Sequence, residues 1–463
     1  MTMLVAGADP MPSTPPVAPP LPLSSSGDGP SPSPSPSGTS ELEVAPPTQR
    51  YRRYVLGILV VVYTLNFVDR QVLAILATAI KAALGLSDSQ VGLMAGLAFA
   101  ALYSTLALPI AWFADRGSRR RIMTWAIALW SAFTVICGFA GSFVQLFLAR
   151  IGVGIGEAGG IAPAYSMISD YFPKEQRARA LSVYSLGIPL GGAFGILLGG
   201  LIAHAIGWRA AFVIVGSAGV VVAPLFRLTV RDPKRGGYEV AADAAPTAKP
   251  RFLDVLRLVS KKSTFWLLAF GAAASSVCGY GLAFWLPSFF DRTLGLTLVE
   301  RSWYYAGITL IGGCFGILGG GVLADRLGKA SRRAYPLIPA IAFLIGLPCF
   351  FFAVNTANVA LAFLLFVIPT GLNLMWLGPI VTAVQHLVPA QMRTMASAMF
   401  LLINNLIGIA IGLYYFGAVS DALAPRYGKE SLHYAIYTGL GFYVLAACLF
   451  FLASRKIRRH WVE

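Results

Sequence analysis

Long apolar stretches separated by short polar ones fill the chain from Tyr54 onward. A helix needs about 20 mostly apolar residues to cross the hydrocarbon core of a bilayer, and each stretch is at least that long. The stretches are continuously apolar and lack the alternation of membrane β-strands. We therefore predict twelve membrane-spanning helices, over residues 54–83, 88–114, 121–140, 143–172, 177–205, 209–230, 263–290, 298–326, 333–353, 357–387, 392–421 and 432–455.

The first 50 residues differ from the rest, because Pro and Ser dominate them and no Lys or Arg precedes Arg50. Such a segment cannot bury enough apolar surface to offset the entropy that is lost on ordering. It also lacks the basic start and apolar core of a signal peptide. We predict a disordered cytoplasmic tail over residues 1–50, either a regulatory segment or a dispensable extension.

Composition agrees with a membrane protein. Of the 463 residues, 57% are hydrophobic and 12% are charged, whereas about a quarter of a soluble domain is charged. Soluble enzymes, nucleic-acid-binding proteins and secreted disulfide-rich domains are therefore poor fits. The five cysteines lie in apolar stretches without the spacing of metal ligands, and only four histidines occur. We expect no metal site and no cofactor.

Basic residues predict the orientation of the chain in the membrane. With both termini cytoplasmic, 28 of the 36 Lys and Arg residues fall in cytoplasmic segments and 6 in outer ones. Cytoplasmic loops carry such an excess. The longest polar interruption, residues 231–262, predicts a cytoplasmic linker between six-helix bundles over residues 51–230 and 263–455, with a cytoplasmic tail over residues 456–463.

An internal repeat supports this division into halves. Pro163, Pro173 and Arg177 have the same spacing as Pro379, Pro389 and Arg393. The segment ADRGSRRR, which begins at Ala114, has a counterpart in ADRLGKASRR, which begins at Ala324. Duplicated helix bundles are the construction of many transporters that work by alternating access, with the substrate held near the midplane of the bilayer.

These motifs resemble the major facilitator superfamily. Its cytoplasmic signature loop has the pattern Gly-x-x-x-Asp-Arg-x-Gly, which Gly321 to Gly328 match fully. The first copy departs from the pattern, because Ala111 and Ser118 replace the glycines. The segment GWRAAF, residues 207–212, resembles the start of the family's sixth helix. The resemblance implies an all-α membrane fold of twelve helices in two pseudo-symmetric six-helix bundles.

Two further segments resemble the spinster branch of this superfamily, and a bacterial-type member of it. They are YTLNFVDRQVLA, residues 63–74, and ARIGVGIGEAG, residues 149–159. Eukaryotic members of that branch export sphingosine phosphate or lysophospholipids. The resemblance implies a monomeric transporter of the bacterial inner (plasma) membrane that moves a small amphipathic or anionic substrate.

Four ionisable residues lie inside predicted spans: Asp69, Arg70, Arg150 and Glu157. A charge at bilayer depth costs about 2.5–3.5 kcal/mol on insertion scales, so these residues should face one another or a wet cavity. Arg150 and Glu157 are two helical turns apart and share a face. We favour pairing of Asp69 with Arg150, which leaves Glu157 to reach Arg70 or substrate; the swapped pairing stays open.

Buried carboxylates change their proton affinity when their solvation and their partners change. We therefore expect Asp69 to be the main proton-coupling residue and Glu157 the second, with a static buried salt bridge as the alternative. Arg70 and Arg150 present the charged fork that suits a phosphate or carboxylate of the substrate. Protons would then be transported with or against the substrate.

Uncharged polar and aromatic residues are candidates for the rest of the substrate cavity, although each is also a candidate for plain helix packing. They are Tyr63, Asn66, Ser276, Tyr280, Asn373, Trp376, Asn404 and Asn405. The two signature loops and the end of the fourth helix supply a candidate cytoplasmic gate, made of Asp115, Arg116, Asp170, Asp325 and Arg326. Arg119, Arg120 and Arg121 are better explained as ordinary topology charges.

The sequence thus favours a secondary transporter that is driven by a proton gradient and moves a lysolipid-like substrate. The first alternative is a proton-coupled transporter of drugs or organic acids, and the second is a membrane receptor without flux. A membrane enzyme is a distant third, because no HExxH, GxSxG or metal-spaced cluster accompanies the intramembrane acids. We therefore do not expect an enzyme.

Overall fold

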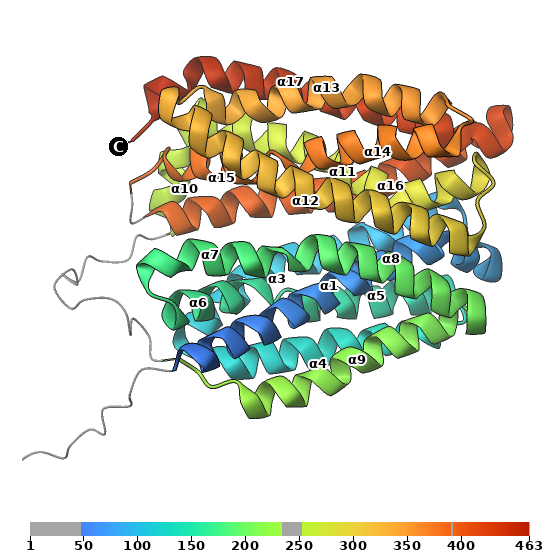
Figure 1. The fold of residues 1–463 in the computed structure, drawn as a ribbon, viewed down its shortest axis with the longest axis horizontal. Helices are drawn as coiled ribbons and strands as arrows, with labels where there is room; N and C mark the ends of the chain where they lie inside the picture. The colour runs from blue at the N-terminus through green and yellow to red at the C-terminus, as the bar shows by residue number, and fades with distance from the viewer. Residues whose placement is uncertain (1–47, 234–251, 390–391, 463) are drawn as a thin grey trace, which may run out of the picture. The chain divides into compact units, whose positions relative to one another are not determined.

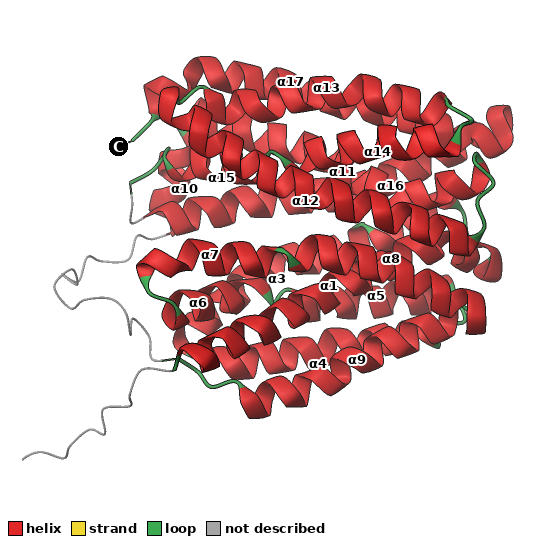
Figure 2. Cartoon of the chain, viewed as in Figure 1, coloured by secondary structure: helices red, strands yellow, loops and turns green. Residues whose placement is uncertain are grey.

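A computed structural model describes residues 48–233, 252–389 and 392–462 (Figure 1). Every regular element in these ranges is helical (Figure 2). The predicted tail, residues 1–50, falls almost wholly outside the described residues, and so does most of the linker prediction, residues 231–262. Residues 231–233 and 252–262 of that linker are described, and Phe252–Ser260 form a short helix that the sequence analysis did not predict.

In the first half, the chain forms α1 (Gln49–Leu84), α2 (Asp88–Ala95), α3 (Leu97–Arg116), α4 (Arg119–Gly138), α5 (Phe143–Glu157), α6 (Ile161–Tyr171), α7 (Lys174–Ser185), α8 (Gly187–Ile206) and α9 (Trp208–Thr229). In the second half it forms α10 (Phe252–Ser260), α11 (Ser263–Arg292), α12 (Leu298–Ala330), α13 (Ala334–Asn355), α14 (Val359–Leu374), α15 (Leu377–Gln385), α16 (Arg393–Tyr427), the 3-10 turn Gly428–Glu430 and α17 (Ser431–His460).

Eleven helical stretches of the described chain are long and apolar enough to cross a membrane. The last of them, Met395–His460, contains both α16 and α17, so the stretches amount to the twelve crossings predicted. The outer bounds differ by a few residues, because α1 begins at Gln49 and α17 continues to His460. Four spans are broken into two helices, and the breaks follow Ala95, Glu157, Ser185 and Leu374.

Each half packs mainly on itself. In the first half α1 lies along α8 and α4 along α9, and in the second half α11 lies along α16 and α17. Figure 1 shows the first half, blue to green, beside the second half, yellow to red. This is the predicted arrangement of two six-helix bundles, and the short helix α10 packs on α11 and α16 of the second one.

The two ends of the bundles are distinct. We call the end with Gln49 of α1 and His460 of α17 the basic end; it lies to the left in Figure 1. The opposite end, where α1 turns into α2, is called the distal end. Gly85 makes that turn with a φ of 62°, and Ser87 caps α2 in a reciprocal hydrogen-bonded box with Gln90.

Contacts between the halves lie in the distal part of the helices. Helix α8 packs on α12, and α2 packs on α16. A Cβ atom on Gly192 would lie 2.9 Å from Thr309, and one on Gly96 would lie 2.9 Å from the carbonyl oxygen of Ile409. Thr78 of α1 donates a 3.4 Å hydrogen bond to Ser288 of α11. Glycine at these seams lets the backbones of opposite halves approach closely.

Candidate functional site: a cavity between the bundles

Two ion pairs join α1 to α5 in the interior of the first bundle. Arg150 Nη1 lies 3.3 Å from Asp69 Oδ2, and Thr134 of α4 donates a 2.7 Å hydrogen bond to the other carboxylate oxygen. Asp69 and Arg150 are each 2% exposed. The pairing that the sequence analysis favoured is therefore the one present, and the swapped pairing is not.

The second pair joins Arg70 to Glu157. Arg70 Nε donates to Glu157 Oε2 over 2.8 Å, and Nη2 of the same guanidinium lies 2.6 Å from that oxygen. Glu157 is 1% exposed, and its other oxygen, Oε1, accepts no hydrogen bond from the described residues. One carboxylate oxygen is thus unsatisfied at bilayer depth, which is costly for an ionised group.

Aromatic rings enclose the Arg70 guanidinium. Its Cζ atom lies 4.7 Å from the ring centres of Phe99 and Tyr103 and 5.1 Å from that of Phe67. Arg150 Cζ lies 5.5 Å from the Phe99 ring. Cations are attracted to the faces of such rings, most strongly where water is excluded. Both arginines are therefore held by rings as well as by carboxylates.

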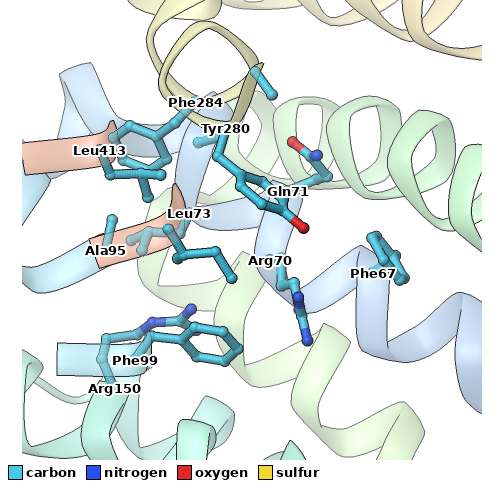
Figure 3. Close-up of a pocket in the computed structure, with 13 residues that line it drawn as sticks. Phe67, Arg70, Gln71, Leu73, Ala95, Phe99, Arg150, Tyr280, Phe284 and Leu413 are labelled. Carbon is cyan, nitrogen blue, oxygen red and sulfur yellow. The ribbon is translucent and has the colours of Figure 1, made fainter. Parts of the chain in front are cut away.

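A cavity of about 80 Å³ lies between the two halves at this level. Arg70 and Arg150 line it from the first bundle, and Tyr280, Phe284 and Leu413 line it from the second (Figure 3). Its remaining lining is Phe67, Gln71, Leu73, Ala74, Ala95, Phe99, Ala283 and Ile409. Ligand sites usually measure about 300–1,000 Å³, so this cavity has room for only a few water molecules and must widen to admit a lipid-sized substrate.

Glycines of α5 bring the site together. A Cβ atom on Gly154 would lie 2.6 Å from the carbonyl oxygen of Phe99, and one on Gly156 would lie 2.5 Å from the backbone nitrogen of Trp130. Helix α5 therefore packs against the backbones of α3 and α4. The helix ends at Glu157, within the glycine-rich segment that the sequence analysis singled out. This break places the Glu157 carboxylate beside α1.

Only one of the eight uncharged residues predicted to line the cavity, Tyr280, does so in the structure. Tyr280 lines the cavity, whereas Ser276 donates to Asn404 over 2.8 Å, and Asn404 donates to Asn405 over 3.2 Å, in the second bundle. Trp376 packs on Phe400, at 6.3 Å between ring centres. Ser276, Asn404, Asn405 and Trp376 are outside the lining of the cavity in this conformation.

The other three predicted cavity residues are also outside its lining. Tyr63 stacks on Tyr184 at 4.4 Å between ring centres. Asn66 is 4% exposed, and Asn373 lies at the break between α14 and α15, close to Gly279. The Oδ1 atoms of Asn66 and Asn373 accept no hydrogen bond from the described residues.

Phe99, Phe284 and Leu413 are lining residues that the sequence analysis missed. The chain contains 29 Phe residues, and no local pattern separates the three that line the cavity from those that fill the bundles. Phe99 comes three residues after Gly96, where the second span breaks. That break is the one signal that points to this region.

The predicted gate at the basic end is described in part. The side chains of Asp115 and Asp325 lie outside the described part of the structure. Asp170 is ion-paired with Arg119, which also lies 4.0 Å from Asp232. Arg119 is 2% exposed, so its description as an ordinary topology charge was wrong: it ties α4 to α6 and to the chain that follows α9.

The other two predicted gate residues lie at the surface of the basic end. Arg116 lies over Trp112 of its own helix, with 3.8 Å from Cζ to the ring centre. Arg326 is exposed on α12. Neither makes a contact between the halves that the structure describes.

A cluster centred on Asp88, which is 2% exposed, joins the two halves at the distal end. Arg292 of α11 donates two 2.7 Å hydrogen bonds to its carboxylate, and Ser420 of α16 donates one of 2.8 Å. Asp421 in turn accepts from the backbone N–H groups of Asp88 and Ser89, over 3.0 and 2.7 Å. The sequence analysis identified Asp88 only as the first residue of the predicted second span.

Comparison with known proteins agrees with this fold. The family model described as Major Facilitator Superfamily matches residues 59–413. The chain belongs to this superfamily. It is therefore a multi-pass membrane transporter by family, and not an enzyme.

Relatives narrow the branch within the Major Facilitator Superfamily. The chain is 34% identical over 409 residues to an MFS-type efflux pump of Mycolicibacterium smegmatis, which covers 88% of the chain and 94% of the relative. It is 29% identical over 437 residues to protein spinster homolog 1 of Xenopus tropicalis, and this match covers 88% of the chain and 82% of the relative. The predicted likeness to the spinster branch is confirmed.

A solved structure resembles the whole described fold. It is a crystal structure of a bacterial homologue of the human lysosomal transporter spinster, in an inward-facing and unoccupied conformation. The two chains are 32% identical with a TM-score of 0.83, and the match covers 90% of this chain and 100% of that one. The same homologue in an inward-facing and occupied conformation gives a TM-score of 0.77.

Proposed function

We propose that this superfamily member is a proton-coupled secondary transporter of an amphipathic, anionic substrate such as a lysolipid or a sphingoid phosphate. The observation that carries the proposal is the pair of arginines on the cavity wall, each backed by a buried carboxylate. A guanidinium binds phosphate or carboxylate through a bidentate fork. The apolar part of the lining suits a hydrocarbon group.

Exchange of partners provides a route to coupling. An anionic head group that binds Arg70 or Arg150 weakens the ion pair with Glu157 or Asp69, and the released carboxylate gains affinity for a proton. The Oε1 atom of Glu157 already has no hydrogen-bond donor among the described residues. Asp69 and Glu157 are therefore proposed as proton carriers, with the gradient as energy source and no cofactor.

The contacts between the halves fit one state of an alternating-access cycle. They lie in the distal part of the helices, where the Asp88 cluster holds the halves together. The similar bacterial structure is inward-facing. We propose that the basic end is cytoplasmic, in a bacterial inner (plasma) membrane with both termini inside, and that the transporter works as a monomer.

One observation favours a second candidate, a proton-coupled transporter of drugs or organic acids. The relative from Mycolicibacterium smegmatis is named an efflux pump, and an aromatic cavity with two arginines also suits an organic anion. A receptor without flux has no observation of its own in its favour.

Reconstitution in liposomes tests the proposal. Purified protein is assayed with lysophospholipids, sphingoid phosphates and small organic acids, with and without an imposed pH gradient. We expect gradient-dependent movement of an anionic lipid and little movement of its uncharged analogue. Equal flux with and without the gradient would refute coupling to protons, and selective movement of organic acids would favour the second candidate.

A further inference from the structure

Phe99 is in contact with both arginines of the site. Its ring centre lies 4.7 Å from Arg70 Cζ and 5.5 Å from Arg150 Cζ, so one ring is shared by the two ion pairs. The side chain is 2% exposed and lines the cavity (Figure 3). In the part of the chain that the structure describes, Phe67 and Tyr103 lie against Arg70 but not against Arg150.

The backbone of Phe99 has little freedom toward α5. A Cβ atom on Gly154 would lie 2.6 Å from the Phe99 carbonyl oxygen and 3.3 Å from its Cα. Closely packed elements occupy discrete positions relative to one another and do not deform continuously. The packing on Gly154 therefore gives the Phe99 ring one defined position beside Arg150, which is itself on α5, and the ring leaves that position only if this part of α3 shifts to another packing on α5.

Phe99 is also one helical turn from the contact between the halves. Gly96, at the break between α2 and α3, packs on α16, where its Cβ would lie 2.9 Å from the carbonyl oxygen of Ile409 and 3.0 Å from Leu413 Cβ. Helix α2 continues this contact up to Asp88 and its partners on α11 and α16. Opening the distal side requires α2 to separate from α16. Gly96 connects α2 to the first turn of α3, which carries Phe99, so a movement of α2 reaches Phe99 through this connection.

We propose that Phe99 is a positioning residue that couples the charge state of the two ion pairs to the opening of the distal side. The ring stabilises Arg70 and Arg150 together only in the position that the closed distal contact gives it. A proton on Glu157 or Asp69 removes the charge partner of one arginine, and that arginine then depends more on the ring. Movement of α2 shifts the ring, so the protonation of the pairs and the position of α2 influence each other.

This inference rests on the proposed proton coupling, but its test needs no substrate. Spin labels are placed at the distal end of each half through Ala83→Cys and Lys429→Cys, both at exposed positions, in a chain whose five native cysteines are replaced. The full chain is reconstituted in lipid nanodiscs. The distance distribution between the labels is measured at about pH 5 and about pH 8, which varies the proton activity to which the buried carboxylates are exposed.

The deciding variant replaces Phe99 by pentafluorophenylalanine, which keeps the shape of the ring and reverses its attraction for cations. We expect the pH-induced change in the ratio of open to closed molecules to fall about 30-fold, the scale of a desolvated cation–π contact. Phe99→Tyr keeps the aromatic face and should keep the response. The matched control is the same replacement at Phe67, which lies over Arg70 alone and should also keep it.

The outcomes separate the inference from the function on which it rests. A wild-type response that persists unchanged in the fluorinated Phe99 variant would overturn the coupling role of the ring. Equal loss in the Phe67 control would also overturn it, because any ring near Arg70 would then suffice. A wild-type protein without a pH response would overturn the inference, because the ion pairs would then not influence the distal side, while proton coupling itself is decided by the liposome flux assay. We expect the wild type to change its ratio of open to closed molecules with pH, and only the fluorinated Phe99 variant to lose this change.

Discussion

Neutralising Asp88 should open the distal side of the transporter. In Asp88→Asn the side chain keeps its size, but Arg292 loses the carboxylate to which it donates two 2.7 Å hydrogen bonds across the seam between the halves. Lys81 loses its 2.5 Å contact with the same carboxylate. Without the carboxylate, Arg292 and Lys81 are more stable when the two halves have separated, because water can then solvate their charges.

The magnitude follows from the bonds that cross the seam. Hydrogen bonds to charged groups contribute about 1.5–3 kcal/mol each. Arg292 is 15% exposed at its side chain, so water screens its contacts and the lower figure applies. Two such bonds give about 3 kcal/mol, which is a shift of roughly 100-fold in the ratio of closed to open molecules.

The spin-label pair at positions 83 and 429 reports this shift as growth of the long-distance population. Lys81→Met is the matched control, because Lys81 contacts Asp88 from within the same half and should change the ratio by less than about fivefold. An Asp88→Asn distribution identical to that of the wild type would show that the cluster does not hold the distal side closed. A shift of equal size in Lys81→Met would show that charge alone, and not the bridge between the halves, sets the ratio.

Two further predictions concern the stability of the site and its scaffold. Arg150→Met should lower the free energy of unfolding by about 3–5 kcal/mol, because it leaves Asp69 buried without its cation. Adding Asp69→Asn to the same chain should restore part of that loss. If denaturant titrations show that the losses of the two variants simply add, the two residues do not interact. Gly316→Ala should sharply reduce the yield of folded protein, because its Cβ would overlap the carbonyl oxygen of Gly371. Gly321→Ala on the same helix is the control, because its Cβ would meet nothing within 4 Å. Equal size-exclusion profiles for the two variants would contradict the packing argument.

The features that the sequence predicted well depend on short stretches of chain. Apolar length sets each span, and an ionisable residue inside a span needs a partner. For this reason the crossings, the two halves and the pairing of Asp69 with Arg150 could be predicted. The two-turn spacing of Arg150 and Glu157 added the geometry, because residues so spaced face one neighbouring helix.

The features that the sequence did not reveal depend on which surfaces meet. Asp88 has the ordinary pattern of a helix start, and nothing near it in the chain indicates that its partners are Arg292 and Ser420. Arg119 lies in a run of arginines, only one of which folds inward onto Asp170. Asn404 and Ser276 satisfy each other inside one bundle, which is the packing alternative that had been left open.

Proton movement in Asp69→Asn and Glu157→Gln tests the central claim most directly. The protein is reconstituted in vesicles that contain a pH-sensitive dye, and proton flux is recorded when an anionic lipid substrate is added. We predict substrate-dependent proton flux in the wild type and its loss in at least one of the two variants, while the distal distances still exchange between open and closed. Undiminished proton flux in both variants would contradict the account.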